Sequence, residues 1–148
     1  MQEETRLKFY QVDAFASEMF RGNPAGVCVL KKWLSDELMQ NIAMENNLAE
    51  TAFIVEEPDG MRIRWFTPAA EVDLCGHATL ASAHVFFNHL NYDSDEIRFN
   101  SRSGPLSVTK AKNLLTLNFP EDIGEEIPFP DELRNTFNDK PSKVLKGV

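Results

Sequence analysis

Two short segments of the sequence carry the residue types that acid–base chemistry needs, and the first is the turn 73–79, Asp-Leu-Cys-Gly-His-Ala-Thr. Gly76 stands directly before a predicted helix. The first backbone N–H groups of a helix have no partner within it, and with the positive end of the helix dipole they bind anions. We therefore predict that a carboxylate docks at this turn, with His77 as a further donor. A plain turn glycine and a capping histidine remain the alternative.

Cys75 lies beside the same helix start, where a thiol is expected to have a lowered pKa and to act as an acid, base or nucleophile. The alternative is that Cys75, like most free cysteines, is a buried packing residue. Cys28 lies inside an apolar run and is expected in the core.

The second segment surrounds Glu50, which lies between a predicted helix end at 46–47 and an apolar strand. Partial burial there would raise the pKa of Glu50 towards that of a useful general acid or base. The alternative is a solvated loop carboxylate, as expected for Glu56 and Glu57.

A metal site formed by Cys75, His77, His84 and His89 is excluded by spacing. His77 and His84 are seven residues apart, which places them roughly 10 Å apart along a helix, too far to bind one ion together. The sequence has no Cys-x-x-Cys or His-Glu-x-x-His pattern. We expect no metal or other cofactor, and surface or capping positions for the histidines.

The elements that must position these residues follow from the hydrophobic pattern. Ser35 predicts the start of a helix that ends near Asn47. A second helix, 77–90, has no full charge in its first ten positions and is expected to be buried on nearly all sides. Turn residues at 21–26 predict a loop, and Pro-Asp-Gly at 58–60 predicts a hairpin. Strands are predicted at 9–15, 27–30, 51–55, 61–65, 97–99, 105–109 and 114–119.

This order of elements predicts an α+β fold in which a mixed, mostly antiparallel sheet curls round a central buried helix. From Pro120 the chain becomes acidic and proline-rich, which indicates an exposed connection, with a short helical patch at 132–137. We therefore expect one domain over 1–119, and a linker and the start of a second domain over 120–148.

The composition limits the partners and the setting. With 148 residues, 43% of them hydrophobic and 26% charged, the chain is expected to be a soluble globular protein. Its formal net charge of -8 argues against nucleic acid and anionic membrane surfaces as partners. No run approaches the about 18 apolar residues of a membrane span. Two cysteines indicate a reducing compartment, so we expect a cytoplasmic protein.

Five separated blocks of the sequence resemble the phenazine biosynthesis PhzF-like family, which is related in fold to diaminopimelate epimerase. These blocks are 9–15 (FYQVDAF), 22–27 (GNPAGV), 47–53 (NLAETAF), 64–68 (RWFTP) and 73–81 (DLCGHATLA). The resemblance implies two pseudo-twofold halves, each a sheet curled round a helix, with a cofactor-free site in the cleft between them. It covers only the first half, so we expect that the sequence is part of a longer chain or that two copies form a homodimer.

The resemblance also implies roles for individual residues. Glu50 would be the acid/base that takes a proton from a carbon of a small carboxylate-bearing substrate and returns it elsewhere. The expected substrate-binding residues are Asp73, Cys75, Gly76, His77 and Ala78. Two alternatives stay open: an amino-acid epimerase or racemase in which Cys75 is the base, and a non-catalytic binding or assembly domain.

Overall fold

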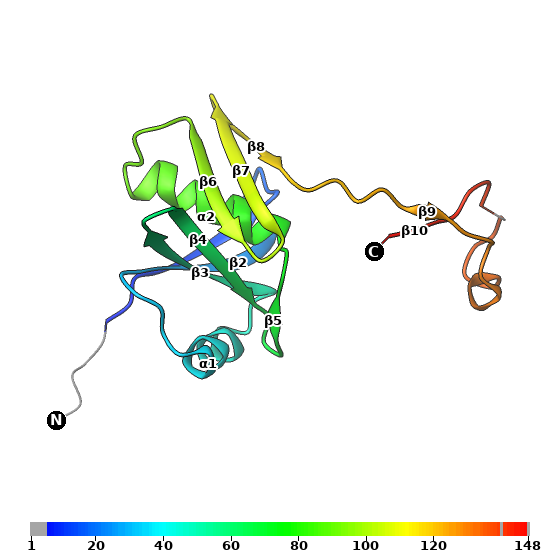
Figure 1. Cartoon of the computed structure of the whole chain (residues 1–148), viewed down its shortest axis with the longest axis horizontal. Coiled ribbons are helices and arrows are strands. Elements are labelled where there is room, and N and C mark those ends of the chain that lie inside the picture. The colour runs from blue at the N-terminus through cyan, green and yellow to red at the C-terminus, as the bar shows by residue number, and fades with distance from the viewer. Residues whose placement is uncertain (1–5, 140, 148) are drawn as a thin grey trace.

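A computed structural model describes residues 6–139 and 141–147 of the chain (Figure 1). The first half of the fold contains β1 (Phe9–Ala14), β2 (Asn23–Leu30), α1 (Asp36–Asn46), β3 (Glu50–Glu57), β4 (Gly60–Phe66) and β5 (Glu71–Val72). It is followed by α2 (Gly76–His89), β6 (Glu96–Ser101), β7 (Gly104–Ala111), β8 (Leu114–Asn118), β9 (Glu125–Glu126), a 3₁₀ turn (Asp131–Leu133) and β10 (Leu145–Lys146).

One sheet with the strand order β1-β2-β3-β4-β6-β7-β8 forms the body of the molecule, and β5 pairs with β4. Two pairs of neighbouring strands in this sheet are parallel, namely β2 with β3 and β4 with β6. The other pairs are antiparallel. Parallel neighbours need a crossover connection, and here α1 and α2 lie in the two crossovers. The predicted mixed, mostly antiparallel α+β fold is therefore confirmed.

The helix α2 is the centre of this fold. It contacts β1 and β8, the two edge strands, as well as β2, β3 and β7, which requires the sheet to curve round it. Most side chains from His77 to Phe87 are buried, as its lack of charged residues predicted. Thr79 and Ser82 fit this apolar setting because their hydroxyls donate to the carbonyls of Cys75 and Ala78.

The helix α1 covers the opposite face of the sheet with a smaller core cluster, in which Met39 and Ala43 pack against Phe53 and Phe66. Ser35 is its N-cap, as predicted, and accepts a hydrogen bond from the Leu38 N–H at 3.2 Å. Asn47 ends α1 with a positive φ of 50°. The next strand begins three residues later, so this tight helix end places Glu50 at the first position of β3.

The prediction of a loop at 21–26 is wrong in part, because β2 already begins at Asn23. Pro24 is tolerated there, since the parallel pairing with β3 starts only at Ala25. Gly26 is a strand residue for a packing reason: a Cβ at this position would lie 2.8 Å from the Phe9 ring and 2.9 Å from the Thr51 hydroxyl. Glycine and proline thus mark close strand packing here rather than a turn.

The chain after β8 extends away from the sheet and ends in the small β9–β10 hairpin (Figure 1). The helical patch predicted at 132–137 is wrong: only the 3₁₀ turn Asp131–Leu133 forms. None of its residues is buried, so a longer helix would have no packing to stabilise it. The division at residue 119 stays a prediction. Within the described residues, no helix has the length and apolar character that crossing a membrane requires.

Candidate active site

Glu50 lies on the face of the sheet that packs against α2. Alternate residues of a strand point to opposite faces, and Ala52 and Ile54 belong to the core cluster around α2. Glu50 therefore shares their side. The parallel pairing of Ala25 with Glu50 brings the Gly-Asn-Pro-Ala-Gly block next to this carboxylate.

The N-terminus of α2 meets Glu50 at this edge of the fold. Cys75 is the N-cap, but its side chain makes no capping hydrogen bond, and the first turn holds no acidic residue. Gly76 is the first helical residue, and a Cβ there would lie 3.1 Å from the Phe119 ring. The absence of a side chain on Gly76 therefore leaves room for Phe119 beside the helix start.

Glu50 and His77 lie together in this site. His77 Nε2 is 3.2 Å from Glu50 Oε2, and the two side chains are 9% and 20% exposed. The orientation is not that of a hydrogen bond, so both atoms are buried polar atoms without a hydrogen-bond partner. Among the described residues only Trp65 Nε1 shares this condition. Buried polar atoms are almost always paired in folded proteins, which makes this pair the natural contact point for a polar ligand.

Cys75 is also part of this cluster, with its Sγ 3.4 Å from His77 Nδ1. The expectation of a lowered pKa is wrong for this thiol. Burial raises the pKa of Cys75 to about 11, and the nearby Glu50 carboxylate adds to the increase, while the N–H groups of Ala78 and His77 act against it. The thiol is therefore protonated at neutral pH. The expected direction of the pKa shift rested on the position of Cys75 beside a helix start. In the fold, desolvation affects this pKa more than the helix N–H groups do.

The other predicted residues lie in different settings. The Asp73 side chain is 70% exposed and faces Arg102 rather than the Glu50–His77 pair. Ala78 is fully buried as a whole residue, backbone included. Glu56 is exposed, as expected, but Glu57 is half-buried because it accepts a hydrogen bond from the Trp33 indole. Of the histidines expected at surface or capping positions, His89 is exposed, whereas His84 is half-buried and His77 is buried.

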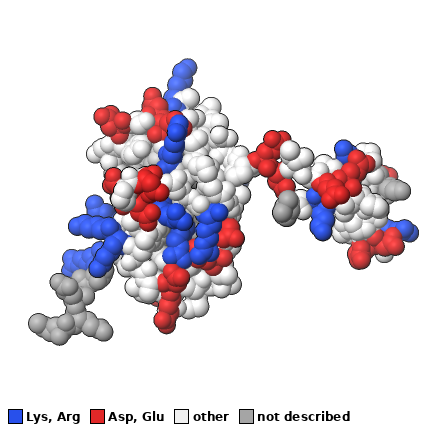
Figure 2. Space-filling model, viewed as in Figure 1, with Lys and Arg blue, Asp and Glu red and all other residues white. Residues whose placement is uncertain are grey.

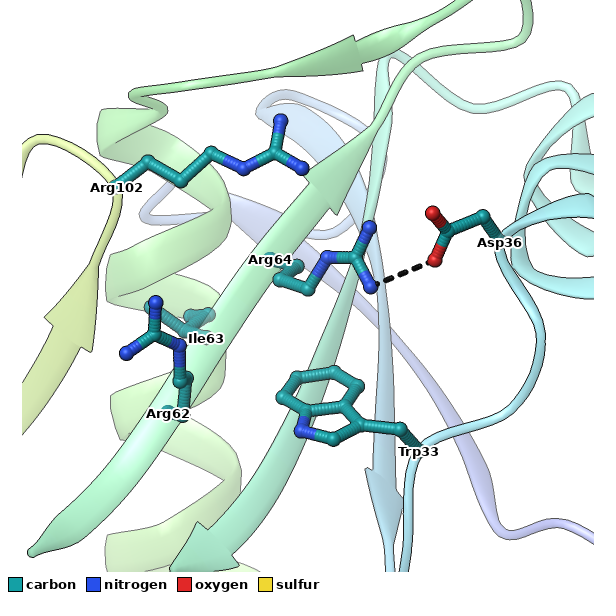
Figure 3. A pocket seen from close by; sticks show the side chains of 6 residues that line it. All are labelled: Trp33, Asp36, Arg62, Ile63, Arg64 and Arg102. Atoms are coloured by element: carbon teal, nitrogen blue, oxygen red, sulfur yellow. Dashed lines mark hydrogen bonds and ion pairs between the residues drawn. The ribbon is translucent and has the colours of Figure 1, made fainter.

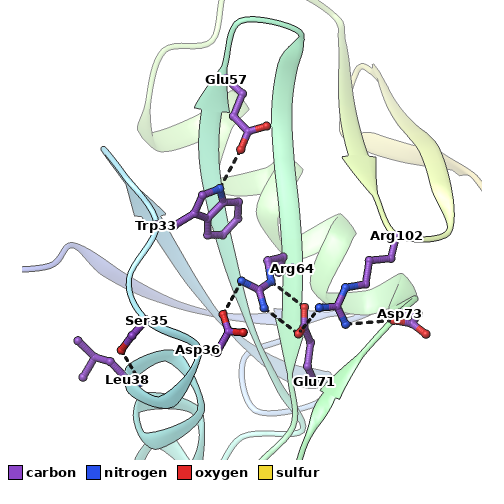
Figure 4. A network of polar contacts seen from close by, with 9 residues as sticks. All are labelled: Trp33, Ser35, Asp36, Leu38, Glu57, Arg64, Glu71, Asp73 and Arg102. Atoms are coloured by element: carbon purple, nitrogen blue, oxygen red, sulfur yellow. Dashed lines mark hydrogen bonds and ion pairs between the residues drawn. The ribbon is translucent and has the colours of Figure 1, made fainter.

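A network of ion pairs missed by the sequence analysis holds the loop that leads into α2 (Figure 4). Arg64 binds Glu71 through two hydrogen bonds of 2.7 and 2.8 Å and also contacts Asp36. Arg102 contacts both Glu71 and Asp73, and the Ser103 hydroxyl donates to the Asp73 carbonyl. The network therefore connects β4 and the β6–β7 turn to the residue two positions before Cys75. Arg62 and Arg64 alternate with the apolar residues Met61, Ile63 and Trp65, a pattern that by itself predicts only that the two arginines face solvent.

A pocket of about 280 Å³ lies beside this network (Figure 3). Its lining residues are Trp33, Asp36, Arg62, Ile63, Arg64 and Arg102. Phe66 lies two residues after Arg64 in β4, so the two side chains point to the same face of the sheet. Phe66 packs against α1, which places this pocket on the face opposite to Glu50. Arg64 and Arg102 are paired with carboxylates, and Figure 2 shows acidic side chains adjoining the basic ones on this face. We therefore assign the chemistry to the α2 face.

Glu50, Cys75 and His77 offer a metal ion ligand atoms that all lie within 4.8 Å of one another. The set weighed from the sequence, which was Cys75, His77, His84 and His89, did not include Glu50. The set fits a structural zinc site poorly, because among the described residues it offers three ligands where such sites use four. In addition, the two imidazole nitrogens face different neighbours, Cys75 and Glu50. We assign no metal to this cluster.

Comparison with known proteins agrees with this fold and with these sequence blocks. The chain is 51% identical over 140 residues to an uncharacterized isomerase of Pseudomonas aeruginosa, covering 95% of this chain and 54% of that protein. A crystal structure of a phenazine biosynthesis PhzF-family protein from Enterococcus faecalis superposes with a TM-score of 0.84 and 50% identity, over 94% of this chain and 54% of the other.

A protein from Pseudomonas aeruginosa described as a predicted epimerase also has a similar structure, with a TM-score of 0.67 and 26% identity over 86% of this chain and 46% of the other. The chain thus spans about half the length of the relatives it matches. The family description "phenazine biosynthesis-like protein" matches residues 12–134, which include Glu50 and the whole turn from Asp73 to Thr79. By this match, the chain is a member of the PhzC-PhzF phenazine biosynthesis-like family.

Proposed function

We propose that this chain carries the proton-transferring half of a cofactor-independent isomerase that acts on a small carboxylate-bearing substrate. The observation that carries the proposal is the pair of buried, unpartnered atoms Glu50 Oε2 and His77 Nε2, 3.2 Å apart at the N-terminus of α2. The isomerase names of the longer relatives support the reaction class.

The substrate carboxylate docks at the start of α2. The N–H groups of its first turn are not satisfied by a capping side chain, and no acidic residue in that turn opposes an anion. His77 adds a donor beside these N–H groups. An anion bound here brings the neighbouring carbon atoms of a small substrate near Glu50.

Glu50 then acts as a general base and afterwards as a general acid. Its carboxylate takes a proton from a carbon of the substrate, and the electron pair of the broken C–H bond delocalises into the adjacent unsaturated system. The same carboxyl group returns the proton to a different carbon, which restores the charge of Glu50 and completes an isomerisation without net oxidation. A general acid–base group of this kind contributes roughly 10²–10⁴-fold to the rate.

Cys75 is a weaker candidate for the base. A thiol with a pKa of about 11 is almost entirely protonated near neutral pH, so very little thiolate is present to accept a proton. A carboxylate needs no such ionisation step. We therefore place Glu50 before Cys75 in this role.

The active unit, in this proposal, contains a second domain or a second copy of the chain. The Glu50 side chain keeps a fifth of its surface exposed, and proton transfer to carbon is favoured when water is excluded. The relatives are nearly twice as long, which supports an active unit with two halves and one cleft between them. We place this enzyme in the cytoplasm as part of the same proposal.

Deuterium exchange tests the proposal. The protein is incubated in D₂O with a panel of small unsaturated and hydroxylated carboxylic acids, and incorporation at carbon is measured by mass spectrometry. We expect enzyme-dependent incorporation that Glu50→Gln abolishes. Incorporation at the same rate in Glu50→Gln would contradict the role of Glu50, and binding of these acids without any exchange would favour the non-catalytic alternative.

A further inference from the structure

The direction of the hydrogen bond between Cys75 and His77 depends on the tautomer of His77. Cys75 Sγ and His77 Nδ1 are 3.4 Å apart, and both residues are buried. Either group can donate in such a contact: the thiol can donate S–H to the nitrogen, or the imidazole can donate N–H to the sulfur. The direction decides which nitrogen of a neutral His77 carries the hydrogen.

The state of the thiol favours S–H as the donor. Burial raises the pKa of the Cys75 thiol to about 11, so its proton remains bound at neutral pH. A neutral imidazole has one N–H and one acceptor nitrogen. If Nδ1 accepts from Cys75, the hydrogen of a neutral His77 must lie on Nε2.

The surroundings of Nε2 agree with this assignment. Nε2 lies 3.2 Å from Glu50 Oε2 and has no other partner. A hydrogen on Nε2 is attracted to the carboxylate and to an anionic ligand. A lone pair at the same place would instead be repelled by both, so the opposite tautomer would leave two acceptors facing each other.

We propose that Cys75 is a positioning residue: its S–H donates to His77 Nδ1 and thereby holds neutral His77 with its hydrogen on Nε2, facing Glu50 and the ligand. The inference deepens the proposed function, because it explains how His77 stays a donor to a bound carboxylate. It needs no turnover for its test, so its failure can be distinguished from failure of the proposed reaction.

Infrared spectroscopy of the S–H stretch tests the donor directly, since this band lies apart from other protein absorptions and moves to lower frequency when the S–H donates a hydrogen bond. Cys28 is the only other cysteine and packs in the separate cluster around α1, so Cys28→Ala identifies its band. We expect the Cys75 band at lower frequency than the Cys28 band. A Cys75 band at the frequency of a thiol without an acceptor, or no Cys75 band, would overturn the proposal.

Two variants identify the acceptor, because the Glu50 carboxylate is also close to the thiol. His77→Leu should return the Cys75 band to the higher frequency, whereas Glu50→Gln should leave it at the lower one. An unchanged Cys28 band shows that the core of the variant is intact. A shift in Glu50→Gln but not in His77→Leu would mean that the thiol donates to Glu50, and the proposal would be wrong.

The tautomer is read from the ¹⁵N shifts of the imidazole nitrogens in uniformly labelled protein at neutral pH. The chain has three histidines, so each can be assigned by substitution. We expect His77 with a protonated Nε2 and an unprotonated Nδ1, and the same pattern in Cys75→Ser, whose hydroxyl is also a donor. A hydrogen on Nδ1 of neutral His77 in the native protein would contradict the inference.

Discussion

Glu50 Oε2 and His77 Nε2 lie 3.2 Å apart, although one residue opens β3 and the other lies in the first turn of α2. Two features of the fold produce this contact: the tight end of α1 at Asn47 and the curvature of the sheet round α2. Neither atom has a hydrogen-bond partner, so the contact forms a small polar site inside an apolar cluster.

A carboxylate should bind at this pair rather than at the arginine-lined pocket on the other face. Titration of ¹⁵N-labelled protein with acetate should shift the backbone amide signals of Gly76, His77 and Ala78 in a saturable way, because these N–H groups begin α2. The control is Arg62→Gln, which alters the other pocket and should leave the titration unchanged. Saturable shifts confined to Arg62 and Arg102 would contradict this assignment.

The sequence could predict this pair only in part. Local residues alone, a glycine before an uncharged helix, are enough to predict an anion-binding helix start. The burial of α2, which was predicted from its lack of charged residues, is confirmed. That Glu50 meets His77 depends on the pairing of β2 with β3 and on the sheet curvature, which no local pattern contains. For Glu50, the family resemblance therefore supplied what spacing could not.

The errors have similar causes. The pKa of Cys75 has the opposite sign to the expectation because burial is a property of the whole fold. Gly26 was assigned to a turn because its residue type favours turns, whereas in the fold it makes room for Phe9 and Thr51. The Arg64–Glu71 pair joins two strands, so neither residue by itself marked a buried contact.

Gly76→Ala should destabilise the fold, because the new side chain crowds Phe119. The added methyl group would lie 3.1 Å from the Phe119 ring, which then has to move. Because this ring is only half-buried, we expect a loss of about 1 kcal/mol in the free energy of unfolding, measured with urea. Phe119→Leu removes the contact and should restore most of the loss in the double variant. Equal losses in the single and double variants would show that Phe119 is not the obstacle.

Glu71→Gln should destabilise the fold by about 2 kcal/mol, since it removes the carboxylate from two short hydrogen bonds to the largely buried Arg64 and from the contact with Arg102. The matched control is Glu96→Gln, which breaks a more exposed pair with Arg98 and should change stability far less. Urea unfolding of the three proteins measures both values. Similar losses in the two variants would mean that the network adds no more than a surface pair.

The buried thiols should make stability depend on alkaline pH. Burial raises the pKa of Cys28 from 9.0 to about 11, whereas the unfolded thiol ionises near the lower value. The stabilisation is therefore fully present below pH 9 and is lost as the pH rises from 9 towards 11. Cys28→Ala should reduce this decline by about 2 kcal/mol relative to the unchanged protein. Parallel curves of unfolding free energy against pH for the two proteins would contradict the burial of Cys28 as its cause.

The central claim, that Glu50 and His77 work as one site, is tested most directly by a double-mutant cycle on the rate of deuterium incorporation into a responding carboxylic acid. Glu50→Gln should lower the rate by about 10²–10⁴-fold, and adding His77→Asn should lower it little further, because residues that act as a unit are strongly non-additive. Glu56→Gln, an exposed carboxylate of the same strand, should keep the full rate. Losses from Glu50→Gln and His77→Asn that multiply in the double variant would contradict the account.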